Sequence, residues 1–165
     1  FVVNQTTNTL LLAAGGGGSG AENDNNNSNM TSYKNGTTQS CGQDAPAHGG
    51  GLTSGGCNGD GGSVDPNLYG QGAGGGYLTN GQGPGGGNAF QNGGEGIAKG
   101  GFGCGGNGGG DGGGGGGGYS GGASGSGGGS PDGPGGGGGS FNGGTNQSNT
   151  DGANTGYGYV TIDKL

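Results

Sequence analysis

Hydrophobic residues gather at the two ends of this chain. Residues 1–14 hold two apolar clusters, Phe1–Val3 and Leu10–Leu12, on either side of a polar stretch rich in Thr and Asn. The other apolar segment, Tyr157–Asp163, alternates, so that its Tyr and Thr side chains share one face and its Val and Ile side chains the other. Alternation with a period of two predicts strands. Because isolated strands are marginal in water, we expect both ends to pair with each other or with a neighbouring chain.

The long middle of the chain carries no hydrophobic period at all. Glycine fills 60 of the 165 positions, in runs such as Gly15–Gly18, Gly112–Gly118 and Gly135–Gly139. Glycine is too poor a helix former for a helix to be expected. Single larger residues interrupt the runs, and six Asn-Gly pairs provide tight turns. These pairs begin at Asn35, Asn58, Asn80, Asn92, Asn107 and Asn142. The pattern favours short extended segments joined by turns.

Such a chain cannot build an ordinary core, because Leu, Ile, Val and Phe together fill about a tenth of it, below the level expected of a packed domain. Glycine segments can instead adopt the left-handed threefold polyproline II helix, which rises about 3.1 Å per residue and has no internal hydrogen bonds. Its buried N–H and C=O groups must pair with adjacent segments. Glycine has no Cβ to keep the backbones apart, so a bundle satisfies this need. Collagen is excluded because the strict Gly-X-Y period is absent.

The sequence therefore predicts a mainly β and irregular fold without an α-helix. A polyglycine II helix bundle is flanked by a small β-sheet or sandwich built from the N- and C-terminal segments. We expect a single glycine-rich domain over residues 1–165. Within it, residues 1–14 form the N-terminal strand segment, residues 15–144 the bundle and its loops, and residues 145–165 a C-terminal loop and strand.

The order of these features resembles the glycine-rich extracellular domain of the anaplastic lymphoma kinase receptor family, and related glycine-rich segments of secreted proteins. The resemblance is carried by Leu10–Gly18, Gly100–Gly106, Gly112–Gly122 and the closing Gly-Tyr-Val-Thr-Ile at 158–162. It implies a polyglycine II bundle flanked by a sheet formed from the termini. The family's EGF-like modules, membrane span and kinase have no counterpart in these residues, so the resemblance carries a fold and no ligand-binding surface.

The charge excludes several classes of partner. Ten acidic residues against three lysines and no arginine give a net charge of −7. Nucleic-acid binding needs clustered basic residues, and so does attraction to an anionic membrane surface; neither is expected here. No apolar run approaches the length of about 18 residues that crosses a membrane.

Three cysteines, Cys41, Cys57 and Cys104, form an odd set. They predict one disulfide between two of the three, with the remaining thiol free or linked to another molecule, in an extracellular or cell-surface protein. A metal site is disfavoured, because His48 is the only histidine and no Cys-x-x-Cys pair occurs.

Catalysis and cofactor binding find little support. The Gly-x-Gly-x-x-Gly pattern of nucleotide-binding folds arises by chance at this glycine content. The phosphate-binding loop motif is absent, because Ala98 precedes Lys99 where that motif needs glycine. Residues 55–60 and 105–111 depart from the glycine-aspartate repeat that binds calcium. Glu22, Asp24 and nearby asparagines are oxygen donors, but a solvated loop is the favoured interpretation. We expect no enzyme activity, no cofactor and no metal.

Five Asn-x-Ser/Thr sequons predict N-linked glycans on a secreted protein. They lie at Asn4, Asn26, Asn29, Asn35 and Asn146. The scattered aromatic residues are expected to cap the ends of the glycine segments and to fill the sheet.

The leading functional hypothesis is an extracellular structural protein, the subunit of a fibril or surface coat that assembles as a homopolymer by strand addition between copies. The alternative is a non-catalytic recognition module, either an adhesin tip or a receptor ectodomain fragment. In that case the loop Asn23–Thr38 is the first candidate for the binding surface. Ice binding would need regularly spaced threonines, which the chain lacks.

Overall fold

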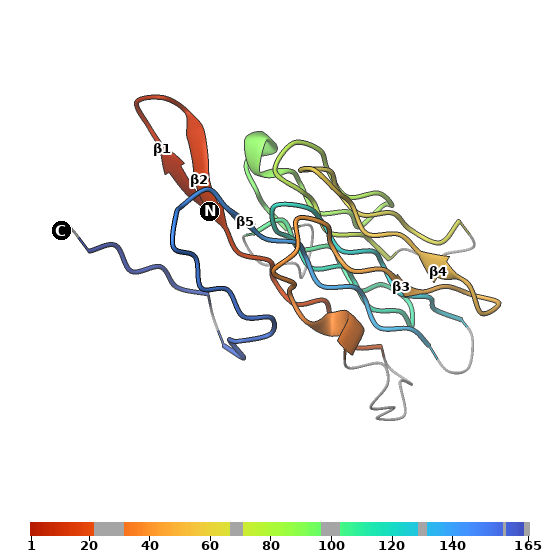
Figure 1. The fold of residues 1–165 in the computed structure, drawn as a ribbon. Helices are drawn as coiled ribbons and strands as arrows, with labels where there is room; N and C mark the ends of the chain where they lie inside the picture. The colour runs from red at the N-terminus through yellow and green to blue at the C-terminus, as the bar shows by residue number, and fades with distance from the viewer. Residues whose placement is uncertain (22–31, 67–70, 97–102, 129–131, 157, 164–165) are drawn as a thin grey trace.

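The computed structural model describes residues 1–21, 32–66, 71–96, 103–128, 132–156 and 158–163. Regular structure within them is sparse (Figure 1). It consists of β1 (Val2–Asn4), β2 (Thr9–Ala13), β3 (Ala45–Pro46), β4 (Leu52–Thr53), the 3-10 helix η1 (Phe90–Asn92) and β5 (Phe141–Asn142). Residues 32–34 add a short helical turn. The described fold is thus mainly irregular with small antiparallel sheets, as the composition predicts.

Residues 1–14, which the sequence predicts as one strand segment, fold back on themselves as an N-terminal hairpin. β1 pairs antiparallel with β2, and the polar residues between the clusters make the turn. The Asn4 side chain fixes that turn, because its Oδ1 accepts hydrogen bonds from the N–H of Thr6 at 2.9 Å and of Thr7 at 3.1 Å. Asn8 supplies the left-handed conformation at φ 52°, which asparagine adopts more readily than most residues.

The third strand of this sheet is not the one that the sequence predicts. The strand order is β1-β2-β5, so β2 pairs with Phe141–Asn142 and not with the alternating segment near the C-terminus. Residues 158–163 form no strand, and Tyr157 lies outside the described residues. The physical reason is that the glycine-rich segment 132–140 leads straight into β5, which occupies the position beside Leu12 and Ala13 of β2. The prediction of a C-terminal strand within the same sheet is therefore wrong for residues 158–163.

Most of the molecule is a bundle of extended segments that run side by side (Figure 1). Their backbone hydrogen bonds repeat every three residues. The N–H groups of Gly113, Gly116 and Tyr119 donate to the C=O groups of Gly133, Gly136 and Gly139, at 3.0, 2.8 and 2.8 Å. The N–H groups of those same three acceptors donate to Ser126, Ala123 and Ser120. Groups that face one partner strand in a β-ladder recur every two residues, so these segments are not β-strands.

Segment 120–126 lies at the centre of this network. Its backbone is hydrogen-bonded to six other segments, which contain residues 43–46, 56, 60–63, 74, 113–116 and 133–139. A strand in a sheet has at most two neighbours along its hydrogen-bonding direction, whereas bonds here leave the segment on all sides. The core of the fold is therefore peptide backbone.

Side chains contribute little to this core. The buried hydrophobic residues among those described are five alanines and Cys104. The segments approach so closely that a Cβ added at Gly121 or Gly122 would lie within 3.0 Å of the backbone of a neighbouring segment. At such positions glycine is required for space, independently of its backbone conformation.

Aromatic residues close one end of the bundle, as the sequence predicts. Phe1, Tyr77 and Phe90 stack on one another, with ring centroids 4.3 to 6.3 Å apart. Tyr119 packs against Phe141 at 5.0 Å, and the N–H of Tyr77 donates to the C=O of Tyr119, which joins the two groups. Tyr77 and Tyr119 each follow directly on a glycine run, so rings of both groups stand where a glycine-rich segment ends.

Ser120 should contribute more to stability than Ser124, although both are fully buried in the central segment. The Ser120 hydroxyl donates to the C=O of Ser40 at 2.7 Å and accepts from the N–H of Gly59 at 3.0 Å. The Ser124 hydroxyl has no partner. We expect Ser120→Ala to lower the free energy of unfolding by about 1–3 kcal/mol, because it leaves the N–H of the buried Gly59 and the C=O of Ser40 without this partner. Ser124→Ala removes the same atom and should be neutral or stabilising. Urea titrations of both variants test this, and equal losses would contradict it.

Candidate functional site

The C-terminal segment, residues 158–163, is extended and exposed. Tyr159, Val160 and Ile162 are 84%, 54% and 77% exposed. No backbone hydrogen bond joins these residues to any other described residue. The segment thus combines the alternation of a strand with backbone groups that have no ladder partner, and Figure 1 shows it running away from the bundle.

The chain just before this segment is held against the bundle. The N–H of Thr38 donates to Oδ1 of Asp151, and the N–H of Gly152 donates to the C=O of Gly36 at 3.2 Å. These contacts fix where the C-terminal segment begins without pairing the segment itself.

An apolar groove lies between the sheet and the C-terminal segment. It has a volume of about 540 Å³, and its walls include Val2, Leu11 and Leu12 from the sheet and Tyr159–Ile162 from the segment. Leu11 remains 45% exposed there. Asn142–Gly144 also line the groove. Because two of these residues are glycines without side chains, the chain after β5 leaves the groove open.

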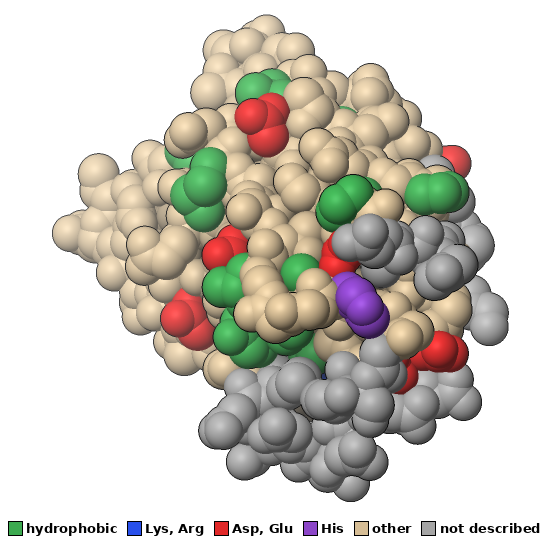
Figure 2. All heavy atoms as spheres, turned by 90° about the vertical axis from the view of Figure 1, so that its right-hand side faces the viewer, with side chains coloured by type: hydrophobic (Ala, Val, Ile, Leu, Met, Phe, Trp, Pro, Cys, Tyr) green, Lys and Arg blue, Asp and Glu red, His purple; other side chains and the backbone are tan. Residues whose placement is uncertain are grey.

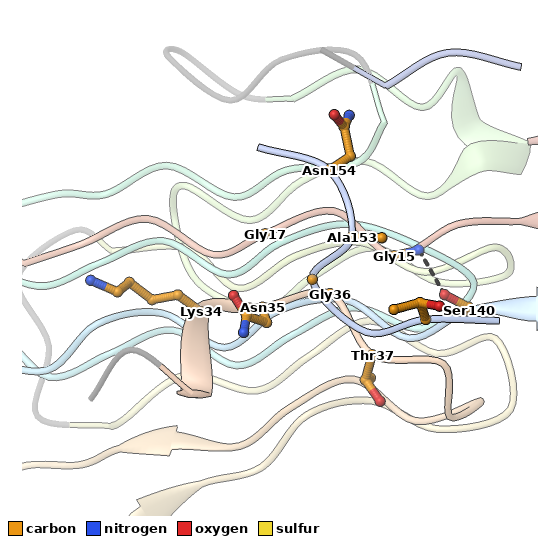
Figure 3. Close-up of a pocket in the computed structure, with 11 residues that line it drawn as sticks. Gly15, Gly17, Lys34, Asn35, Gly36, Thr37, Ser140, Ala153 and Asn154 are labelled. Atoms are coloured by element: carbon orange, nitrogen blue, oxygen red, sulfur yellow. Dashed lines mark hydrogen bonds between the residues drawn. The ribbon is translucent and has the colours of Figure 1, made fainter. Parts of the chain in front are cut away.

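A second hollow, about 210 Å³ in volume, lies under residues 150–154 (Figure 3). Gly15, Gly17 and Gly36 contribute backbone to its wall, and the N–H of Gly15 donates to the Ser140 hydroxyl at 2.9 Å. The Lys34 side chain points away from that bond in Figure 3. The hollow is therefore lined mainly by peptide groups and uncharged polar side chains, with Lys34 as the charged residue among them.

The cysteines divide into a bridge and a buried thiol. Cys41 and Cys57 form a disulfide, which selects one of the pairings that the sequence leaves open. Cys104 is fully buried, and burial raises the pKa of its thiol to about 11. In the folded chain this thiol stays protonated at neutral pH and cannot reach another molecule. The expectation that the third cysteine could link neighbouring copies is therefore not supported.

Three of the five sequons fall on described residues. Asn4, Asn35 and Asn146 are all exposed. Asn4 ends β1, Asn35 follows the helical turn and lines the hollow of Figure 3, and Asn146 follows β5. Asn26 and Asn29 lie outside the described residues, as does most of the loop Asn23–Thr38.

Carboxylates are dispersed over the face shown in Figure 2, which also displays His48 among small separate groups of hydrophobic side chains. The backbone N–H of His48 donates to Oδ2 of Asp65 at 2.6 Å. Among the described residues, no three His, Cys, Asp or Glu side chains lie close enough together to hold a metal ion. Glu22 and Asp24 lie outside the described part of the chain.

No described helix is long and apolar enough to cross a membrane. Comparison with protein-family models, with curated proteins and with solved structures returned no match. The resemblance to the glycine-rich domain of the receptor family therefore stays a prediction.

Proposed function

We propose that this chain is an extracellular structural protein, a subunit that polymerises into a fibril or surface coat by strand addition between copies. The observation that carries the proposal is the C-terminal segment 158–163. An exposed, alternating and unpaired segment beside a small sheet has the form of a donor strand. In strand addition the main-chain bonds supply affinity, and pockets for alternate side chains supply specificity.

The glycine-rich segments are polyglycine II helices in this proposal. The three-residue repeat of their hydrogen bonds supports it, because the left-handed threefold helix presents its N–H and C=O groups sideways in three directions. The six hydrogen-bonded neighbours of segment 120–126 support it as well. Such a bundle suits a structural subunit, because hydrogen bonds join each segment to its neighbours in every lateral direction and make the bundle stiff in all of them.

The extracellular location rests on the Cys41–Cys57 disulfide, which is compatible with an oxidising compartment. Glycans at Asn4, Asn35 and Asn146 fit the same location, since all three side chains are exposed. We propose no catalytic role. The recognition module remains the alternative that the experiment below separates from a polymer.

Electron microscopy and sedimentation of the full chain at high concentration test this function. We expect filaments from the native chain and none from Val160→Ser/Ile162→Ser, because the double variant removes the apolar side chains of the donor strand. The matched control is Leu52→Ser/Leu78→Ser, which removes two side chains 57% and 46% exposed on the bundle; it should still form filaments. A native chain that stays monomeric would overturn the polymer and favour the recognition module.

A further inference from the structure

We infer that the acceptor for the C-terminal segment of a second copy is the flank of β2 beyond the end of β5, together with the groove beside Leu11. This inference rests on the proposed function, and it names the two surfaces that meet. Each copy then carries one donor and one acceptor, which are formed by different residues.

β5 stops before it covers β2. It pairs with Leu12 and Ala13, and the last bond on this side runs from the N–H of Gly143 to the C=O of Leu11, at 2.9 Å. Thr9 and Leu10 therefore have no partner strand among the described residues on the flank where β5 lies. An incoming strand that pairs there continues the line of β5.

Local side-chain bonds explain why β5 ends at Asn142. Oδ1 of Asn142 accepts from the N–H of Gly144 at 3.0 Å, and its C=O accepts from Nε2 of Gln147 at 2.8 Å. Bonds of this kind compete with a ladder and favour a turn. The chain turns away at this point, and the flank of β2 stays open.

A bulge presents Leu11 to the groove. Val2 pairs with Leu12 and Val3 pairs with Leu10, so Leu11 is the extra residue on β2. A bulge re-aims a side chain at a sheet edge, and Leu11 lines the groove while 45% exposed. Apolar side chains on one face of an incoming strand would pack against it.

The chain's own C-terminal segment does not fill this site. Tyr159–Ile162 line the groove, but they form no backbone bond to the sheet and stay more than half exposed at Tyr159, Val160 and Ile162. Donor and acceptor are therefore both open in one copy. A contact between two different surfaces is heterologous, and it builds an open filament when the rotation does not close a ring.

Two full-length variants, made without glycans so that masses compare, test the assignment. Leu11→Glu places a charge in the acceptor and keeps the donor, whereas Val160→Ser/Ile162→Ser keeps the acceptor and removes the donor. We expect each variant alone to sediment as a monomer. An equimolar mixture should give a particle of twice that mass and nothing longer, because one intact donor meets one intact acceptor. Leu78→Glu, at 46% exposure the closest match to Leu11, should polymerise as the native chain does.

The outcomes separate this inference from the proposed function. Filaments from Leu11→Glu alone would overturn the acceptor and leave the polymer standing, with the outer edge of β1 as the next surface to examine. Filaments from Val160→Ser/Ile162→Ser would overturn the donor, and with it this inference and the assembly by strand addition that the proposed function names, whereas a native chain that stays monomeric would overturn the polymer itself. Two monomeric variants that fail to form the paired particle, with unfolding curves like that of Leu78→Glu, would also overturn the acceptor.

Discussion

Gly121→Ala should strongly destabilise the folded bundle. The added Cβ would lie inside the van der Waals distance of the Gly74 backbone and 2.8 Å from the nitrogen of Gly62. Backbone cannot rotate away as a flexible side chain does, and both neighbours are themselves bonded to further segments. We expect a loss above about 3 kcal/mol, the upper end for overpacked interiors, against a total stability of about 5–15 kcal/mol for ordinary domains. Urea titration followed by tyrosine fluorescence and protease resistance measures it.

Gly51→Ala is the matched control for this substitution. Gly51 is exposed, and its added Cβ would meet nothing nearer than the Ala47 side chain at 3.9 Å. We expect a change within about 0.5 kcal/mol, as for most surface positions. If the two variants unfold at the same urea concentration, close contact between backbones does not determine the stability of the bundle.

Removing the disulfide should be the second large perturbation. Cys41 and Cys57 are separated by 16 residues, and closing a loop of this size stabilises a fold by about 3 kcal/mol through the entropy of the unfolded chain. The bridge also joins segments that are hydrogen-bonded to each other, since the N–H of Gly42 donates to the C=O of Gly56. We expect Cys41→Ser/Cys57→Ser to lower the free energy of unfolding by that amount in urea titrations.

A reducing agent distinguishes the bridge from the serine substitutions themselves. It should destabilise the native chain by about as much as the double variant loses. It should leave the double variant unchanged, because Cys104 is already a thiol. A double variant as stable as the native chain would show that backbone bonds alone hold these two segments in place.

The sequence predicts strand structure in residues 1–14, but neither its arrangement as a hairpin nor the third strand of the sheet. Phe1–Val3 and Leu10–Leu12 carry a local signal for strand structure, because they are apolar clusters beside a polar stretch. The third strand has no such signal. β5 consists of only two residues, Phe141–Asn142, which come shortly after a glycine run. They pair with β2 because that run ends beside it in space, and the local sequence carries no signal for this. The alternation of the last segment is real, yet its partner lies outside the chain in our proposal.

The bundle interior shows the same limit. Glycine content predicts backbones packed without side chains, and the aromatic caps follow from it. The neighbours of segment 120–126 do not follow from the glycine content, because runs of identical residues can pair in many registers with similar energy. Asn58-Gly59 makes the predicted tight turn, with Asn58 at φ 55° and the N–H of Asp60 donating to the C=O of Cys57. Asn80-Gly81 instead places Gly81 in an extended segment that bonds to Gly87. Local sequence alone does not separate these two outcomes.

A core made of peptide groups changes how stability depends on temperature. Unfolding an ordinary domain exposes apolar surface and raises the heat capacity by about 12–15 cal/mol/K per residue, whereas exposing polar surface lowers it. Here the buried hydrophobic side chains described are small, so we expect a smaller increase in heat capacity per residue. The stability curve of this protein should then be flatter than that of an ordinary domain. Its stability should weaken less on cooling than that of a domain with a large hydrophobic core.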